Sequence, residues 1–122
     1  MSLNLISGRT GAFDWLFQRV SGVVLAVAFA VHFIVLHFLG DGTFTYESVA
    51  TRLASPFWKT FDLVFLFFAL YHCVTGARLI MDDYLHHPTW RTAITCFLWI
   101  LAIVLFMMGA VTVFSLKAPV AA

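Results

Sequence analysis

The residues whose types and spacing could do chemistry lie in one apolar stretch, Ser55 to Tyr84. This stretch has the length and apolarity of a membrane-spanning helix. Between Leu63 and Met81 its clearly polar side chains are His72, Thr75 and Arg78. Ionisable side chains at membrane depth are costly, so they mark a binding or transfer site by default. The stretch is therefore predicted to carry a buried site around the histidine.

Helical periodicity places four residues of this stretch on one stripe: His72, Gly76, Leu79 and Asp83, at i, i+4, i+7 and i+11. A glycine one turn after the histidine leaves space beside the imidazole, where a flat macrocycle could lie. The alternative is close helix packing at Gly76 without any cofactor. Both interpretations predict that Gly76 does not face open lipid.

The far end of the stretch offers further polar groups. Arg78 lies about 9 Å along the helix axis from His72, within reach of the propionates of an axially ligated haem. Alternatively, Arg78 extends towards the membrane surface. Asp83 and Tyr84 lie roughly 15–18 Å from His72, at the surface. They either serve a quinone head group as proton donors or are simply solvated interface residues.

Composition indicates the elements that must position these residues. The sequence is 62% hydrophobic and 11% charged, and its mean hydropathy is +0.97, which is typical of a membrane protein. The net charge of +1 gives no indication of nucleic-acid binding. We predict an all-α membrane protein with a single membrane-anchor domain over residues 1–122. Its three transmembrane helices are expected at about residues 15–39, 56–84 and 88–116.

The first predicted span carries several polar residues of its own. Asp14 is expected to cap its N-terminus. Arg19 and Ser21 follow in the first turns, and Arg19 either extends to the interface or faces an anionic cofactor group or a quinone oxygen. His32, deeper in the span, is either a metal ligand or, as more often in such helices, a hydrogen-bonding partner of a neighbouring helix. His37 lies nearer the interface and has a weaker claim to ligand status.

Short connecting segments complete the sequence pattern. Residues 45–55 are expected to form a surface helix capped by Thr45, and Ser55-Pro56 is a helix-start signal for the second span. Pro88 is expected to start the third helix. Cys73 and Cys96 lie inside predicted spans and are interpreted as buried free thiols rather than a disulfide.

Three spans place the start of the first helix and the end of the second on one membrane face. This face carries four cationic side chains (Arg9, Arg19, Arg78 and Arg91), and the other carries three (Arg52, Lys59 and Lys117). Because cytoplasmic loops carry an excess of Lys and Arg, the count slightly favours a cytoplasmic location for the Tyr84 face.

Three blocks of the sequence resemble a known family. They are GRTGAFDWLFQR at residues 8–19, GTFTYESVATRLASPFWKTF at residues 42–61, and His72 followed eleven and twelve residues later by Asp83-Tyr84. In these blocks the chain is similar to the small hydrophobic anchor subunit of bacterial succinate dehydrogenase, of the kind in which two three-helix anchors share one haem b. QRVSG at residues 18–22 and the spacing of His72, Gly76 and Arg78 also resemble the larger partner anchor.

The resemblance implies roles for individual residues. His72 would be one axial ligand of the haem b iron, and the partner anchor would supply the other. Arg19 would lie near the haem propionates and the quinone pocket. Tyr84 would hydrogen-bond a ubiquinone head group, with Asp83 in the same polar environment. Ser21 belongs to the quinone environment in this interpretation. His32 and His37 are not explained by a single haem, which leaves a second haem as an open alternative.

The resemblance also implies partners and a location. The chain would form a six-helix bundle with a second cytochrome b anchor in the bacterial cytoplasmic (inner) membrane. A separate flavoprotein subunit would oxidise succinate, and an iron–sulphur subunit would pass the electrons to ubiquinone. The isolated chain would not catalyse this reaction alone. Two alternatives remain open: a fumarate reductase anchor that uses menaquinone, and a purely structural anchor without haem.

Overall fold

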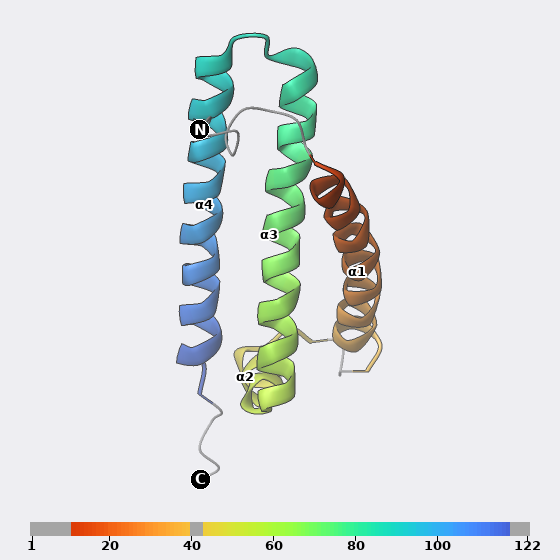
Figure 1. Ribbon diagram of the computed structural model, residues 1–122. Helices are drawn as coiled ribbons and strands as arrows, with labels where there is room; N and C mark the ends of the chain where they lie inside the picture. Colours follow the sequence, from red (N-terminus) through yellow and green to blue (C-terminus); the bar gives the residue numbers. More distant parts are fainter. Residues whose placement is uncertain (1–10, 40–42, 118–122) are drawn as a thin grey trace.

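The computed structural model describes residues 11–39 and 43–117, and all regular secondary structure in these residues is α-helix. Its elements are α1 (Ala12–His37), α2 (Tyr46–Ala54), α3 (Pro56–Tyr84) and α4 (Pro88–Ser115). Helix α3 packs against each of the other three and lies between α1 and α4 (Figure 1). The short α2 lies at the end of the bundle where α3 begins (Figure 1). The predicted all-α architecture is confirmed.

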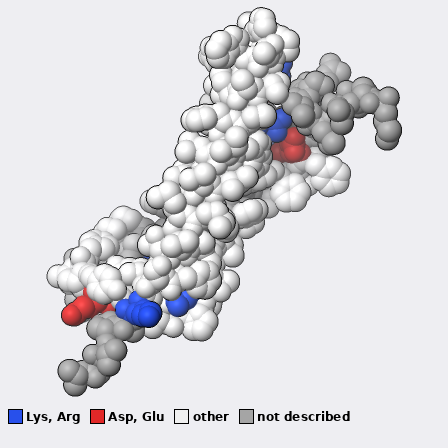
Figure 2. Space-filling model, turned by 90° about the vertical axis from the view of Figure 1, so that its left-hand side faces the viewer, with Lys and Arg blue, Asp and Glu red and all other residues white. Residues whose placement is uncertain are grey.

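The helices α1, α3 and α4 are each long and apolar enough to cross a membrane. Within the described part of the chain, only four hydrophobic residues are buried: Ala50, Leu53, Val74 and Ala102. Large apolar side chains cover the outside instead, and the visible charged side chains gather near the two ends of the molecule (Figure 2). An apolar exterior with charged ends is the pattern expected of a multi-pass membrane protein.

Local signals explain most helix boundaries. Pro56 and Pro88 occupy the first turns of α3 and α4, where a missing N–H costs nothing. Ser55 is the N-cap of α3 as expected, although its side chain makes no capping bond. The prediction that Asp14 caps α1 is wrong, because the helix begins earlier, after Gly11. Asp14 instead lies in the first turn, where a carboxylate interacts favourably with the helix dipole.

Helix α2 forms as the sequence predicts. Thr45 Oγ1 accepts a hydrogen bond from the backbone N–H of Ser48 at 3.2 Å, and Ser48 Oγ accepts one from the backbone N–H of Thr45 at 3.2 Å. This reciprocal capping box satisfies two backbone donors at the helix start. Ala50 and Leu53 are the buried residues of α2, which packs against α3.

The two cysteines differ from expectation in their burial. Cys73 and Cys96 are free thiols, as predicted, but both are exposed on the surface of the chain. The sequence locates a residue within a span, but it does not show whether that side of the helix is covered by another helix. A prediction of burial from membrane depth alone therefore fails for a bundle of only three spanning helices.

The turn between α3 and α4 is fixed by an ion pair between Asp82 and Arg91. Further along the same pair of helices, the Tyr71 and Trp99 rings lie 6.3 Å apart between centroids. Gly109 lies directly against the Leu66 side chain, so that position has no room for a larger residue. These contacts hold α4 against one side of α3 and leave another side to α1.

Candidate functional site

His72 lies on α3 and forms a hydrogen bond with α1. Its Nδ1 is 2.9 Å from Ser21 Oγ, and Ser21 also donates to the backbone carbonyl of Gln18 at 3.0 Å. Ser21 is completely buried. The sequence placed Ser21 in a quinone environment, whereas the structure brings it to the imidazole.

Gln18 forms a second connection between the two helices. Its Nε2 donates to the backbone carbonyl of His72 at 3.4 Å, and its Oε1 accepts from the hydroxyl of Thr75. We refer to Gln18, Ser21, His72 and Thr75 as the seam cluster. These bonds run across the α1–α3 seam and fix both the backbone and the ring of the histidine.

Two glycines permit this close approach. A Cβ at Gly76 would lie 3.0 Å from Gln18 Nε2, and a Cβ at Gly22 would lie 3.3 Å from His72 Cε1. Both distances are shorter than ordinary contact, so larger residues would push the helices or the ring. Within this chain, Gly76 therefore serves helix packing, which was one of the two interpretations of its position. A flat group bound at His72 would have to lie elsewhere around the ring.

The second ring nitrogen of His72, Nε2, is the atom of the seam cluster that remains free to coordinate a ligand. Among the described residues, none forms a hydrogen bond with Nε2, and the side chain is partly exposed. No group of three or more His, Cys, Asp or Glu side chains in the described part of the chain could hold a metal ion. Metal binding at His72 would therefore need ligands from a cofactor or from another chain.

The predicted cationic residues lie near the same end of the bundle. Arg78 lines a notch of about 10 Å³ together with Asp14, Gln18 and Thr75. A notch of this volume has room for about one water molecule. Arg19 lies on the exposed side of α1, where its guanidinium is 4.1 Å from the centre of the Trp15 ring. Both arginines are thus close to the membrane face on which α1 begins.

Tyr84 and Asp83 end α3 and are both exposed, Tyr84 to 78%. Tyr84 lies twelve residues after His72, or about 18 Å along the axis. In the described residues no hydrogen bond joins either side chain to the seam cluster. These two polar groups are available to a ligand or to a partner at the membrane surface.

A second polar cluster lies towards the other end of the bundle. Arg52 on α2 donates from its Nη1 and Nη2 atoms to the two carboxylate oxygens of Asp62 on α3, at 3.3 and 2.9 Å. His32 on α1 has its Nδ1 3.6 Å from Asp62 Oδ1, and its ring lies against Phe65. We refer to Arg52, Asp62 and His32 as the ionic cluster. It joins three helices.

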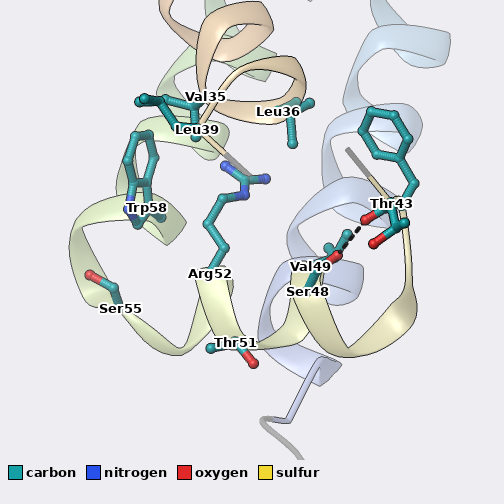
Figure 3. A pocket seen from close by; sticks show the side chains of 11 residues that line it. Val35, Leu36, Leu39, Thr43, Ser48, Val49, Thr51, Arg52, Ser55 and Trp58 are labelled. Carbon is teal, nitrogen blue, oxygen red and sulfur yellow. Dashed lines mark hydrogen bonds between the residues drawn. The ribbon is translucent and has the colours of Figure 1, made fainter. Parts of the chain in front are cut away.

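Figure 3 shows the surroundings of the Arg52 side chain. The Arg52 side chain points from α2 towards the end of α1, and its guanidinium carbon lies 5.5 Å from the centre of the Trp58 ring. A cavity of about 430 Å³ lies at this corner, between the end of α1, α2 and the start of α3. Its walls are apolar on the α1 side and carry hydroxyl groups on the α2 side (Figure 3).

The sequence analysis missed two residues of these clusters, Asp62 in the ionic cluster and Gln18 in the seam cluster. Asp62 is an ionisable residue seven positions into α3, and its depth alone was a usable signal. Gln18 follows Asp14 by four residues and precedes Ser21 by three, so the three share one helix face. A polar stripe on a spanning helix predicts a polar partner helix, and this stripe faces His72 and Thr75.

Comparison with known proteins gives a consistent result. Residues 1–114 match the family of succinate dehydrogenase/fumarate reductase transmembrane subunits. The succinate dehydrogenase hydrophobic membrane anchor subunit of Rickettsia typhi is 35% identical over 66% of this chain and 62% of its own length. The proteins of the same name from Rickettsia conorii and Rickettsia prowazekii are 26% and 28% identical. Those two alignments cover 88% and 87% of this chain, and 85% and 83% of the relatives.

Proposed function

Because the chain belongs to the succinate dehydrogenase/fumarate reductase transmembrane subunit family, we propose that it anchors succinate:ubiquinone oxidoreductase and shares one haem b with a second anchor subunit. A flavoprotein subunit and an iron–sulphur subunit would dock on the membrane face that carries Tyr84. The relatives are named hydrophobic membrane anchor subunits, which supports the anchoring part of this proposal. The three spanning helices would contribute half of a six-helix bundle.

The haem proposal rests on the observation that His72 Nε2 has no hydrogen-bond partner among the described residues. A neutral imidazole binds a metal through one nitrogen while the other donates a hydrogen bond. His72 has Nδ1 bonded to Ser21, and Nε2 has no partner in the described residues. Haem b would supply one-electron transfer, and the second axial ligand would come from the partner anchor. Because Gln18 occupies the space beside Gly76, the bound group would lie outside the α1–α3 seam.

The quinone site would lie at the end of α3. Tyr84 offers a phenolic O–H that can donate to a quinone carbonyl, and Asp83 can supply or orient a proton. Their exposure at the membrane face supports this role. Arg19 and Arg78 would balance the haem propionates near the same face. Two electrons from the iron–sulphur subunit and two protons would convert the quinone to the quinol.

This arrangement implies an orientation. The soluble subunits must meet the membrane face with Tyr84, and the excess of arginines on that face favours the cytoplasmic side. The proposed location is therefore the bacterial cytoplasmic membrane, with the α3–α4 turn in the cytoplasm. The ionic cluster would then lie towards the opposite face.

A spectroscopic comparison of two histidine variants tests the haem proposal. The purified complex is reduced, and its reduced-minus-oxidised spectrum is recorded for the wild type, His72→Ala and His37→Ala. His37 is the control, because its Nδ1 contacts its own helix at Phe33 O, 3.1 Å away, and it is exposed. We expect a b-type signal that His72→Ala abolishes or shifts and that His37→Ala leaves unchanged.

Each other outcome has a definite meaning. A signal that survives His72→Ala unchanged would contradict ligation by His72 and would move the ligand to His32 or to another chain. The absence of any haem signal from the wild type would contradict haem sharing and favour a structural anchor.

A further inference from the structure

The hydrogen bonds around Ser21 favour one of the two possible positions of the His72 ring proton. Ser21 has one hydroxyl proton, and its Oγ lies near two groups: the Gln18 carbonyl at 3.0 Å and His72 Nδ1 at 2.9 Å. A carbonyl oxygen can only accept, whereas an imidazole nitrogen can donate or accept. Two arrangements of protons are therefore compatible with these distances.

In the first arrangement every donor in this group has a partner. Ser21 donates to the Gln18 carbonyl, and a proton on His72 Nδ1 is donated to Ser21 Oγ. In the second, Ser21 donates to Nδ1, and the ring proton then sits on Nε2, which has no acceptor among the described residues. An unpaired polar group in the apolar layer is costly, so the first arrangement is favoured.

The surroundings hold the ring in this state. Ser21 is completely buried, so water cannot compete for its hydroxyl. Gly22 lies against the ring at Cε1, and Gln18 holds the His72 backbone carbonyl. The imidazole is thus constrained by a hydrogen bond at one nitrogen and by close packing at the adjacent carbon. The lone pair of Nε2 then points away from Ser21.

We propose that Ser21 is a positioning residue that fixes His72 as the Nδ1-protonated tautomer and so prepares Nε2 for axial coordination. This inference rests on the proposed haem ligation by His72. It assigns Ser21 to the histidine rather than to the quinone, because a completely buried hydroxyl bonded to His72 has no surface left for a quinone. A hydrogen bond donated from the remote nitrogen makes an imidazole a more basic ligand.

A more basic ligand stabilises the oxidised iron, which gives the direction of the test. The assembled complex is compared for the wild type, Ser21→Ala and Ser21→Thr by redox titration and by haem content after dilution in detergent. We expect Ser21→Ala to assemble, to lose haem faster, by about tenfold, and to shift the midpoint potential upwards. Ser21→Thr retains the hydroxyl and is expected to restore both properties. Ser115→Ala is the matched control, because Ser115 donates only to its own helix at Val111.

The outcomes separate this inference from the proposal it rests on. If Ser21→Ala has the potential and haem retention of Ser115→Ala while His72→Ala loses the haem signal, Ser21 is not a positioning residue and the ligation stands. If the wild type holds no haem, both ideas fall. If Ser21→Ala does not assemble, Ser21→Cys keeps most of the volume with a weak acceptor and is expected to give the same upward shift. An unshifted potential in that variant would overturn the inference.

Discussion

The seam cluster and the ionic cluster are both groups of polar side chains inside an apolar bundle. They differ in their charges and in which atoms remain without a hydrogen-bond partner. Asp62 and His72 are ten residues apart on α3, about 15 Å along its axis. In the ionic cluster the Arg52 charge meets both carboxylate oxygens of Asp62. In the seam cluster four side chains satisfy one another except at one ring nitrogen. The ionic cluster also leaves two buried nitrogen atoms without a hydrogen-bond partner among the described residues, His32 Nδ1 and Arg52 Nε. Its Arg52–Asp62 pair is nevertheless bidentate, which is typical of a structural role, whereas a partly exposed imidazole nitrogen without a partner is typical of a binding site.

The two clusters should also differ in what they contribute to stability. Removing one partner of a buried ion pair leaves an uncompensated charge, at a cost of about 3–5 kcal/mol. A single hydrogen bond between membrane helices averages only about 0.6 kcal/mol. Breaking the ionic cluster should therefore damage assembly, and breaking the seam cluster should mainly change the properties of His72.

The largest expected effect is that of Asp62→Leu. The side chains of Arg52 and Asp62 are each 15% exposed, so Arg52 would be left nearly buried and unpaired. We expect a loss of about 3–5 kcal/mol in stability, seen as a lower denaturation temperature and reduced yield of the complex. The haem spectrum of the complex that does form should be unchanged.

The double variant Arg52→Met/Asp62→Leu is the control for this prediction. Replacing both charges by apolar side chains of similar volume is often neutral or stabilising. Recovery of stability in the double variant would confirm that the cost arises from the unpaired arginine. An altered haem spectrum in either variant would contradict the separation of the two clusters.

The second prediction concerns a residue that belongs to neither cluster. Tyr84→Phe removes only the phenolic O–H, so assembly and haem spectrum should be retained. Loss of one hydrogen bond to the substrate, worth about 1.4 kcal/mol, should lower the rate of quinone reduction about tenfold. Tyr46→Phe, an exposed tyrosine at the start of α2, is the control for loss of a phenol. Normal quinone turnover in Tyr84→Phe would remove Tyr84 from the quinone site.

The fold could be predicted from the sequence because its signals are local. The lengths of the apolar stretches predict the three spans. Thr45, Pro56 and Pro88 predict where α2, α3 and α4 begin. The Asp14 prediction failed for the same reason, since capping residues occur both before and inside the first turn. In this chain α1 continues back to Ala12, and its N-cap residue, Gly11, has no side chain that could form a capping hydrogen bond.

The candidate site could be predicted only in part. His72 was identified by its depth in an apolar helix, which is a property of the sequence. Its contact with Ser21 depends on the rotation of α1 against α3, which the sequence does not specify residue by residue. The pairing of Asp62 with Arg52 likewise depends on how α2 turns back onto α3. Periodicity shows which residues share a face, and packing decides which faces meet.

The third prediction asks whether the cap or the ion pair holds α2 in place. Thr45→Ala removes the side-chain acceptor for the Ser48 N–H, and loss of such a cap costs about 1 kcal/mol. We expect faster hydrogen exchange in the first turn of α2, with Arg52 still paired. Thr60→Ala is the control, because the Thr60 hydroxyl donates within its own helix to the Pro56 carbonyl. Exchange throughout α2 as fast as in Asp62→Leu would show that the cap, rather than the ion pair, fixes this helix.

The smallest expected effect on stability is that of Thr75→Val, and it separates the two clusters most clearly. The change keeps the side-chain shape and removes the donor to Gln18, so it should cost only about 0.6 kcal/mol. Thr112→Val, which removes a bond within α4 alone, is the matched control. If Thr75 acts through Gln18 on the His72 backbone, its variant should shift the haem midpoint potential while Thr112→Val does not. A large loss of stability without a shift would instead give the seam cluster the same structural role as the ionic cluster. If both variants lose the same small amount of stability and neither shifts the midpoint potential, Ser21 alone positions His72. The ring would then be insensitive to the hydrogen bond between Gln18 and the His72 backbone carbonyl.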